Sequence, residues 1–208
     1  MTHIAQFLGE EADLGPEKRI AILSAPLASS VSWLGGTELG PRAIIDASPA
    51  LEVFDDELLS ETVRLGIVTR PEPDFTGLAA TEACRQIRDG VAAELAKGMF
   101  PVLLGGEHTV TVPAVQACLA QYPDLHVVQI DAHLDLRQEY EGNENSHACV
   151  MRRLADMGVP FTQIGIRSFS KEEYELIQAK GWRPFYMQRI RSEADWIAQV
   201  CAGIKGPV

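Results

Sequence analysis

The sequence has few cysteines, and they follow no recognisable pattern. Cys84, Cys118, Cys149 and Cys201 are far apart and include no C-x-x-C pair. Zinc ribbons and disulfide frameworks both depend on closely spaced cysteines, so neither is indicated. Unpaired thiols persist in reducing compartments. The cysteine usage therefore favours a cytoplasmic protein.

Long apolar runs and a basic N-terminal segment are also missing. No stretch approaches the roughly 18 apolar residues that a membrane span needs. The N-terminus turns acidic at Glu10 and Glu11 and has none of the charge pattern of a secretory leader. We therefore expect a cytoplasmic protein that makes no membrane contact.

Basic residues are in deficit. The 208-residue chain has 18 Lys and Arg against 29 Asp and Glu, a formal net charge of −11. That charge would repel phosphate backbones and anionic lipid, so we expect no nucleic-acid partner. The apolar content of 46% is typical of a globular domain.

Short apolar runs alternate with longer helical patterns, which indicates a parallel sheet covered by helices. We expect strands at 19–25, 64–69, 100–104, 125–130, 161–166 and 185–188, and helices at 78–95, 111–121, 149–157 and 171–180. Ser170 and Glu173 form a capping box for the last of these, and Gly181 ends it. The prediction is one three-layer α/β/α domain over residues 1–208, with a mainly parallel sheet.

The C-terminal pattern predicts that this domain is incomplete. Ser192 and Asp195 resemble another helix start, and residues 206–208 read as a turn that enters a further strand. A compact α/β domain does not normally stop at the start of a central strand. The last strands are therefore expected to be missing, and the alternative is a natural terminus with a frayed tail.

The sharpest motif is Asp131-Ala-His133-Leu-Asp135, directly after an apolar strand. Side chains at i, i+2 and i+4 of an extended chain point to one side, so all three can converge. The carboxyl ends of strands in open α/β sheets are where ligands bind. Carboxylates held together repel each other unless a cation lies between them. A metal site is favoured, and the alternative is a solvated strand end with helix-capping aspartates.

A second strand ends in Gly105-Gly106-Glu107-His108. The glycines allow a sharp turn and a close approach, which would place His108 at the same sheet edge as the Asp131 motif. Glu107 is expected to be structural or to support the ligands. The motif is no phosphate-binding P-loop, because no Gly-Lys-Ser/Thr follows.

The third block is Asn145-Ser146-His147-Ala148-Cys149. A loop histidine beside a metal cluster can transfer protons near neutral pH. Without the metal motif, His147 would be only the first turn of a helix capped by Ser146. We expect Cys149 to be packed rather than nucleophilic, and His126 to be structural.

Carboxylate and imidazole ligands favour Mn²⁺ or a similar divalent ion over structural zinc. In sequence order, the three blocks resemble the ureohydrolase family that contains arginases and agmatinases. Residues 36–43, 51–55 and 163–168 resemble further parts of that family. The resemblance implies an arginase-like fold, two Mn²⁺ ions held by His108, Asp131, His133 and Asp135, and catalytic roles for His147 and Asp135. It also implies a homo-oligomer, either a trimer or a hexamer.

Two departures from the family pattern stand out. Ser146-His147-Ala148 replaces the usual Ser-His-Gly, a change that leaves the chemistry intact. The family's Ser-x-Asp-x-Asp-x-x-Asp-Pro strand end, which carries two more aspartate ligands, is absent. We therefore expect the 208-residue piece alone to hold no complete metal pair and to be inactive.

The resemblance implies a hydrolase that releases urea from a small cationic guanidino compound. The acidic segment 137–145 favours agmatine, which yields putrescine, over arginine, because glutamates would repel a substrate carboxylate. The alternatives are another guanidino hydrolase, such as an arginase or a guanidinobutyrase, and a catalytically silent family member. An anion-binding module at Gly105 and Gly106 is a weaker alternative, because the neighbouring carboxylates would repel an anion.

Overall fold

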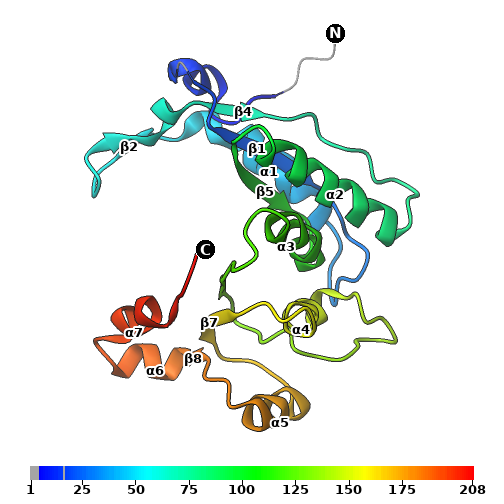
Figure 1. Ribbon diagram of the computed structural model, residues 1–208. Coiled ribbons are helices and arrows are strands. Elements are labelled where there is room, and N and C mark those ends of the chain that lie inside the picture. The colour runs from blue at the N-terminus through cyan, green and yellow to red at the C-terminus, as the bar shows by residue number, and fades with distance from the viewer. Residues whose placement is uncertain (1–4, 16) are drawn as a thin grey trace. The chain divides into compact units, whose positions relative to one another are not determined.

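The computed structural model describes residues 5–15 and 17–208 (Figure 1). Residues 1–4, which open the acidic N-terminal stretch, and Pro16 lie outside the described residues. The chain divides into two units, Met1–Cys118 and Leu119–Val208, and each is described by itself. The expectation of one domain over residues 1–208 stays a prediction.

The first unit is built on a three-stranded parallel sheet. Strand β1 (Ile20–Ala25) lies between β4 (Ile67–Thr69) and β5 (Phe100–Gly105). Ile20 is paired in register with Ile67 on one side and with Phe100 on the other. The strands expected at 19–25 and 100–104 are confirmed to within one residue. A nearly continuous apolar run is typical of a parallel strand buried on both faces.

The strand expected at 64–69 is wrong in its first half. Residues Thr62–Leu65 form a 3₁₀ turn (η4), and pairing begins only at Ile67. Between them Gly66 has φ 80°, and a Cβ at that position would lie 1.7 Å from the Glu17 carbonyl oxygen. The chain turns here because a distant segment packs directly on its backbone, which the local sequence does not reveal.

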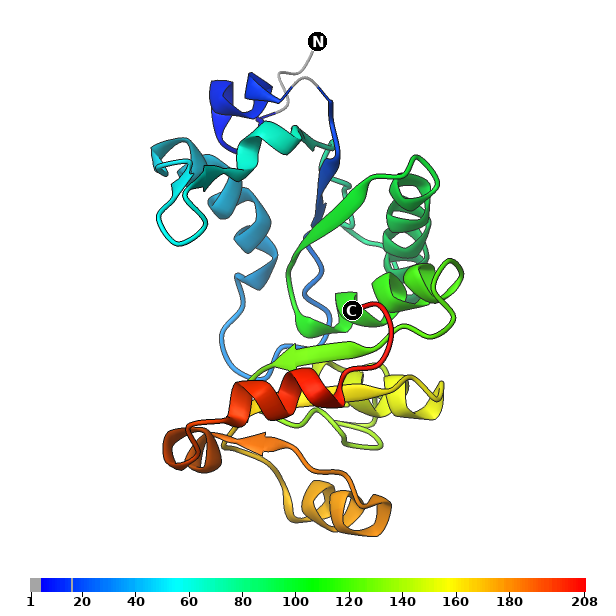
Figure 2. The same ribbon diagram turned by 60° about the vertical axis from the view of Figure 1, so that its left-hand side comes forward.

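Helices cover both faces of this sheet. Helix α2 (Ala80–Leu95) buries a stripe of apolar residues that recur every four positions, Ala83, Ile87, Val91 and Leu95, and α3 (Thr111–Leu119) follows β5. Helix α1 (Gly40–Ala47) lies on the opposite side of β1 from α2 (Figure 2). Helix α1 was not predicted, although the proline at its second residue suits a first helical turn. The remaining elements are η1 (Gly9–Leu14), η2 (Thr37–Leu39), η3 (Ser48–Ala50), β2 (Phe54–Asp55) and β3 (Ser60–Glu61).

The second unit has its own parallel sheet, in the order β6 (Val127–Ile130), β7 (Phe161–Ile166) and β8 (Phe185–Tyr186). The strand expected at 161–166 is confirmed at both ends. The one expected at 185–188 is shorter, because Met187 already begins helix α6 (Met187–Ser192). Together the two parallel sheets and their helices confirm the α/β class.

Four helices belong to this unit: α4 (Val150–Asp156), α5 (Lys171–Lys180), α6 and α7 (Trp196–Gly203). Helix α5 has the bounds that its capping signals predict. Ser170 Oγ accepts a hydrogen bond from the Glu173 backbone at 3.3 Å, and Gly181 ends the helix with φ 67°. One side of the sheet packs against α7 through Ile164, Phe185 and Val200.

The helix expected near Ser192 and Asp195 is present as α7, with Asp195 as its N-cap, but Ser192 does not begin it. Ser192 is the last residue of α6, and its hydroxyl donates back to the carbonyl of Gln188 at 3.2 Å. A serine hydroxyl can cap a helix or bond back to the preceding turn, and the residues before it decide which. Beyond α7, Gly206 has φ 103° and turns the chain as expected, and the Pro207 carbonyl accepts a hydrogen bond from the His126 backbone at 2.8 Å.

Within the described residues, no helix combines the length and the apolar character needed to cross a membrane. All four cysteines are free thiols, as their spacing predicts.

Candidate metal centre

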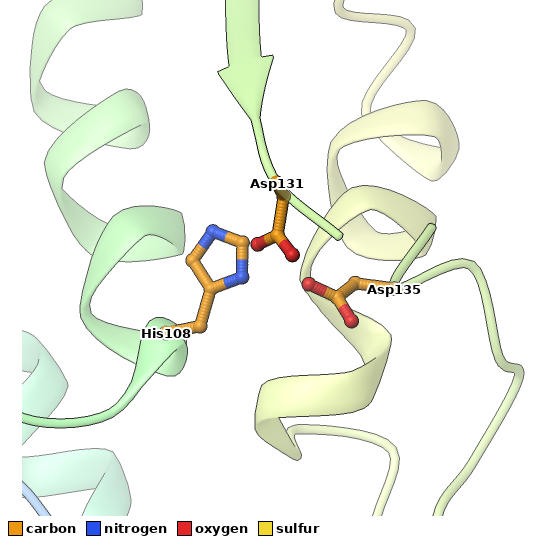
Figure 3. Close-up of side chains that lie close together, drawn as sticks. All are labelled: His108, Asp131 and Asp135. Atoms are coloured by element: carbon orange, nitrogen blue, oxygen red, sulfur yellow. The ribbon is translucent and has the colours of Figure 1, made fainter. Parts of the chain in front are cut away.

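Asp131 and Asp135 bring two carboxylates together at the carboxyl end of β6. Their oxygens lie within 4.8 Å of each other. Figure 3 shows Asp131 directly after the strand and Asp135 on the loop that follows, with the two carboxylates turned toward each other. Asp135 is buried, with 7% of its surface exposed. Two like charges this close are unfavourable without a cation, so the pair is suited to hold one.

The carboxylates meet for a different reason from the one that the sequence suggested. An extended chain would carry Asp131, His133 and Asp135 on one side, but the strand ends at Ile130. Asp131 Oδ1 accepts a hydrogen bond from the His133 backbone at 2.8 Å, and Asp135 has φ 51°. The chain therefore curls after the strand, and this curl returns Asp135 toward Asp131.

The His133 side chain stays close to Asp131 but faces outward. Its Nδ1 lies 3.4 Å from Asp131 Oδ1, and 62% of the side chain is exposed. An exposed imidazole beside a carboxylate can rotate onto a cation held by that carboxylate at little conformational cost. His133 therefore remains a candidate ligand.

His108 lies in the first unit, in the 3₁₀ turn η5 (His108–Val110) directly after β5, and is half-buried. The Gly105-Gly106 turn that precedes it makes the close approach expected of it, but to another part of the backbone. A Cβ on Gly106 would lie 2.0 Å from the Leu27 carbonyl oxygen. Gly106 is needed because two chain segments of this unit pack closely together there. His108 comes two residues later, so this close packing helps to set its position in the unit.

Glu107 is structural, as expected. Its buried carboxylate accepts four hydrogen bonds, from the backbone and the hydroxyl of both Ser29 and Ser30, at 2.6–2.9 Å. These contacts tie the loop after β1 to the loop after β5. Glu107 thereby fixes the chain segment that carries His108.

Replacing Glu107 with alanine is expected to lower the free energy of unfolding by about 3 kcal/mol, because the donors of Ser29 and Ser30 lose the buried, charged acceptor that they share. Urea denaturation of the purified protein would measure the change. The matched control is Glu17→Ala, which removes an exposed carboxylate paired with Arg19 and should leave stability nearly unchanged. Equal stability of both variants would contradict the structural role of Glu107.

His147 opens the 3₁₀ turn η6 (His147–Cys149) and is held by two neighbours. Its Nδ1 lies 3.2 Å from Ser146 Oγ, and its ring meets the edge of Tyr140 with centroids 5.5 Å apart. Ser146 also accepts a hydrogen bond from the Ala148 backbone at 3.4 Å. Ser146 therefore has two roles at once: it caps the turn and it contacts the His147 ring.

The acidic segment next to His147 forms a tight turn. Tyr140 and Asn143 exchange two backbone hydrogen bonds of 3.0 Å around Glu141 and Gly142, both with positive φ. Glu144 pairs with Arg153 at 3.1 Å. The turn leaves Glu139 and Glu141 exposed on either side of Tyr140, whose ring contacts His147.

Two other residues have the structural roles expected of them. Cys149 is fully buried, and burial raises the pKa of its thiol. A nucleophilic cysteine requires the opposite shift. His126 is buried with Nε2 2.9 Å from Thr162 Oγ1, and burial lowers its pKa.

Sequence reasoning missed three buried polar residues around Asp135. They are Gln129, Gln163 and Glu173, with 6%, 2% and 4% of their surface exposed. A glutamine inside each of two apolar strands was the available signal, because a buried amide requires specific partners. Glu173 was predicted only as part of a capping box, yet it also accepts a hydrogen bond from the Leu136 backbone at 3.0 Å.

The residues present fit a divalent metal. Carboxylate oxygens are the ligands that Mn²⁺ and Mg²⁺ prefer, and imidazole suits the borderline members of this series. Asp131 and Asp135 supply the carboxylates, and His133 supplies an imidazole beside Asp131. These residues are a possible metal-binding group. Their chemistry favours a hard or borderline divalent ion.

Comparison with known proteins places the chain among ureohydrolases. The N(1)-aminopropylagmatine ureohydrolase of Synechocystis sp. is 36% identical over 206 residues, which cover 96% of this chain and 67% of that protein. The agmatinase of Bacillus subtilis is 34% identical, and the match covers 83% of this chain and 58% of that protein. The chain thus spans about two-thirds or less of the length of these relatives.

Solved structures agree with the sequence relatives. The agmatine ureohydrolase of Thermoplasma volcanium matches 98% of this chain and 69% of its own, with a TM-score of 0.81 and 26% identity. The proclavaminate amidino hydrolase of Streptomyces clavuligerus shares the fold, with a TM-score of 0.78 at 23% identity. The family model described as "Arginase family" matches residues 18–207, which is nearly the whole sequence. The chain therefore belongs to the arginase family.

Proposed function

We propose that this protein is a manganese-dependent hydrolase that cleaves agmatine to putrescine and urea. The observation that carries the proposal is the pair of Asp131 and Asp135 carboxylates at the end of β6, within 4.8 Å of each other, in a chain of the arginase family. When bound, divalent ions lower the pKa of water toward neutrality and so supply a nucleophile at physiological pH.

Four residues form the proposed ligand set, His108, Asp131, His133 and Asp135. Each follows the carboxyl end of a parallel strand, β5 for His108 and β6 for the others. The two aspartates balance the charge of the ions, and the imidazoles add neutral ligands. Asp135 is also proposed to be catalytic, because its carboxylate would lie beside any ion that it shares with Asp131.

His147 is proposed to transfer the proton that the leaving amine requires. Cleavage of the bond between the guanidinium carbon and the substituted nitrogen produces urea and an amine, and that amine leaves readily only when it is protonated. Ser146 and Tyr140 orient the imidazole for this transfer.

The acidic turn supports a substrate without a carboxylate. Glu139 and Glu141 lie on either side of Tyr140, so they place negative charge near His147. That charge attracts the amino group of agmatine and repels the carboxylate of arginine. A second candidate substrate is N(1)-aminopropylagmatine, because the relatives that act on it are up to 38% identical to this chain, against 34% for the agmatinases.

A urea assay on the product of the native gene, supplied with Mn²⁺, tests the proposal. We expect kcat/KM for agmatine to exceed that for arginine by at least about 10-fold. One missing methylene already changes kcat/KM by about 10-fold or more, and repulsion of the arginine carboxylate should have at least as large an effect. The same assay with N(1)-aminopropylagmatine ranks the two cationic candidates. Bound Mn²⁺ without urea from any of these three compounds or from guanidinobutyrate would identify a catalytically silent family member instead.

A further inference from the structure

Gln129 and Gln163 occupy paired positions in the second unit's sheet. Gln129 on β6 lies directly opposite Gln163 on β7 in the parallel register. Both side chains are buried, with 6% and 2% of their surface exposed. A buried amide is unfavourable unless it is hydrogen-bonded. Two such amides at paired positions therefore indicate a role that apolar residues could not fill.

The two amides form a chain of hydrogen bonds with one direction. Gln163 Nε2 donates to Gln129 Oε1 at 2.6 Å and to the Leu134 carbonyl at 2.7 Å. Gln129 Nε2 donates to the His133 carbonyl at 3.4 Å and to Asp135 Oδ2 at 3.3 Å. Every receiving group is a carbonyl or a carboxylate, so turning either amide over would set oxygen against oxygen.

The backbone that carries Asp135 needs support of this kind. Asp135 has φ 51°, a left-handed conformation that a residue with a Cβ adopts only when its surroundings impose it. Its carbonyl accepts a hydrogen bond from the Arg152 backbone at 3.1 Å. The next amide, that of Leu136, donates to Glu173 Oε1 at 3.0 Å, and Glu173 is itself held by the N-terminus of α5. The peptide group that follows Asp135 is thus held at both its carbonyl and its N–H.

The side chain is oriented from the sheet. The carbonyls of His133 and Leu134 and the carboxylate of Asp135 all accept hydrogen bonds from the paired amides. Both strands therefore hold the loop that curls back toward Asp131. Because one carboxylate oxygen of Asp135 is bonded to Gln129, the position of the other oxygen is restricted as well.

We propose that Gln129 and Gln163 are positioning residues for the metal site: their directional amide chain orients the Asp135 carboxylate toward a divalent ion shared with Asp131. This inference rests on the proposed function, since it assumes that Asp131 and Asp135 hold metal. It adds two residues that touch neither substrate nor ion. It also explains why two amides persist at paired positions inside a sheet.

Two substitutions test the proposal in the product of the native gene. Gln129→Leu removes the donor to Asp135 at similar volume. Gln163→Glu keeps the size but replaces a donor by an acceptor, so the Gln129 amide must turn its nitrogen toward residue 163 and its oxygen toward Asp135. Loss of a group that orients a ligand typically weakens metal binding by about 10–100-fold, and we expect both variants to bind Mn²⁺ this much more weakly.

Mn²⁺ affinity is measured by titration, with electron paramagnetic resonance detecting the free ion. The thermal unfolding midpoint of each metal-free variant is measured alongside. Thr162→Val is the matched control, because it removes the hydrogen bond between Thr162 on β7 and His126, the residue directly before β6. It should lower the unfolding midpoint and leave Mn²⁺ affinity unchanged. If the glutamines have only a structural role, both glutamine variants should behave like Thr162→Val, with a lower unfolding midpoint and unchanged Mn²⁺ affinity.

The outcomes separate this inference from the proposed function. If the unsubstituted protein binds no Mn²⁺, the proposed function fails and the inference fails with it. If the unsubstituted protein binds Mn²⁺ and both glutamine variants bind it equally well, only the positioning role is overturned. Should Gln129→Leu fail to fold, Gln163→Glu decides the matter, because it preserves the volume of the buried pair.

Discussion

Replacing Asp131 with asparagine is expected to weaken Mn²⁺ binding by more than about 100-fold, beyond the loss typical of a group that merely supports a ligand. Asparagine keeps the size of the side chain, and its oxygen can still accept the hydrogen bond from the His133 backbone. The loop after β6 should therefore keep its course. What disappears is the negative charge that balances the ion, and urea formation should fall with the metal content.

Thermal unfolding distinguishes this loss from a folding defect. A ligand that binds only the folded state at about 100 times its dissociation constant adds roughly 2.7 kcal/mol of stability. The unsubstituted protein should therefore unfold at a higher temperature with Mn²⁺ than without it, and Asp131→Asn should show no such difference. In metal-free protein the variant should be the more stable of the two, because the repulsion between Asp131 and Asp135 is removed.

Asp156→Asn is the appropriate control for this experiment. Asp156 ends α4 in the same unit and pairs on the surface with Arg152 at 3.0 Å. Its loss removes the same charge without touching the carboxylate pair, so the Mn²⁺ response should match that of the unsubstituted protein. A full Mn²⁺ response in Asp131→Asn would exclude Asp131 as a ligand.

Replacing His147 with alanine is expected to lower turnover by roughly 10²–10⁴, the usual contribution of a positioned proton-transfer group. Mn²⁺ content should not change, because His147 is not among the proposed ligands. The combination of full metal content with lost turnover separates a proton-transfer role from a ligand role. Atomic absorption on the dialysed enzyme, alongside the urea assay, measures both quantities.

His126→Asn provides a matched control for His147. His126 is a buried histidine of the same unit that bonds to Thr162 rather than to the candidate site. Its replacement should lower stability while turnover per folded molecule persists. Unaltered turnover in metal-replete His147→Ala would remove His147 from the mechanism, and parallel losses in both variants would indicate a general folding defect.

Local patterns accounted for those parts of the fold whose causes lie within a few neighbouring residues. Helix α5 has its predicted bounds because Ser170, Glu173 and Gly181 satisfy the groups at its own ends. The stripe of α2 follows from the helical repeat, which places every fourth residue on the buried face. The candidate ligands were predictable for the same reason, since Asp131 and Asp135 are close in the chain and their chemistry is that of their side chains.

The sequence by itself determined the residue types at the candidate site, the family and the alternation of strands and helices. Tertiary structure decided how those residues are held. Asp131 and Asp135 meet through a left-handed turn instead of along an extended strand, because amides from two strands and the carboxylate of Glu173 hold that turn. Glu107 is satisfied by Ser29 and Ser30, far away in the chain. Periodicity shows which residues face inward, but the partner that a buried polar group finds there depends on which distant segment packs against it, and only the folded chain brings the two together.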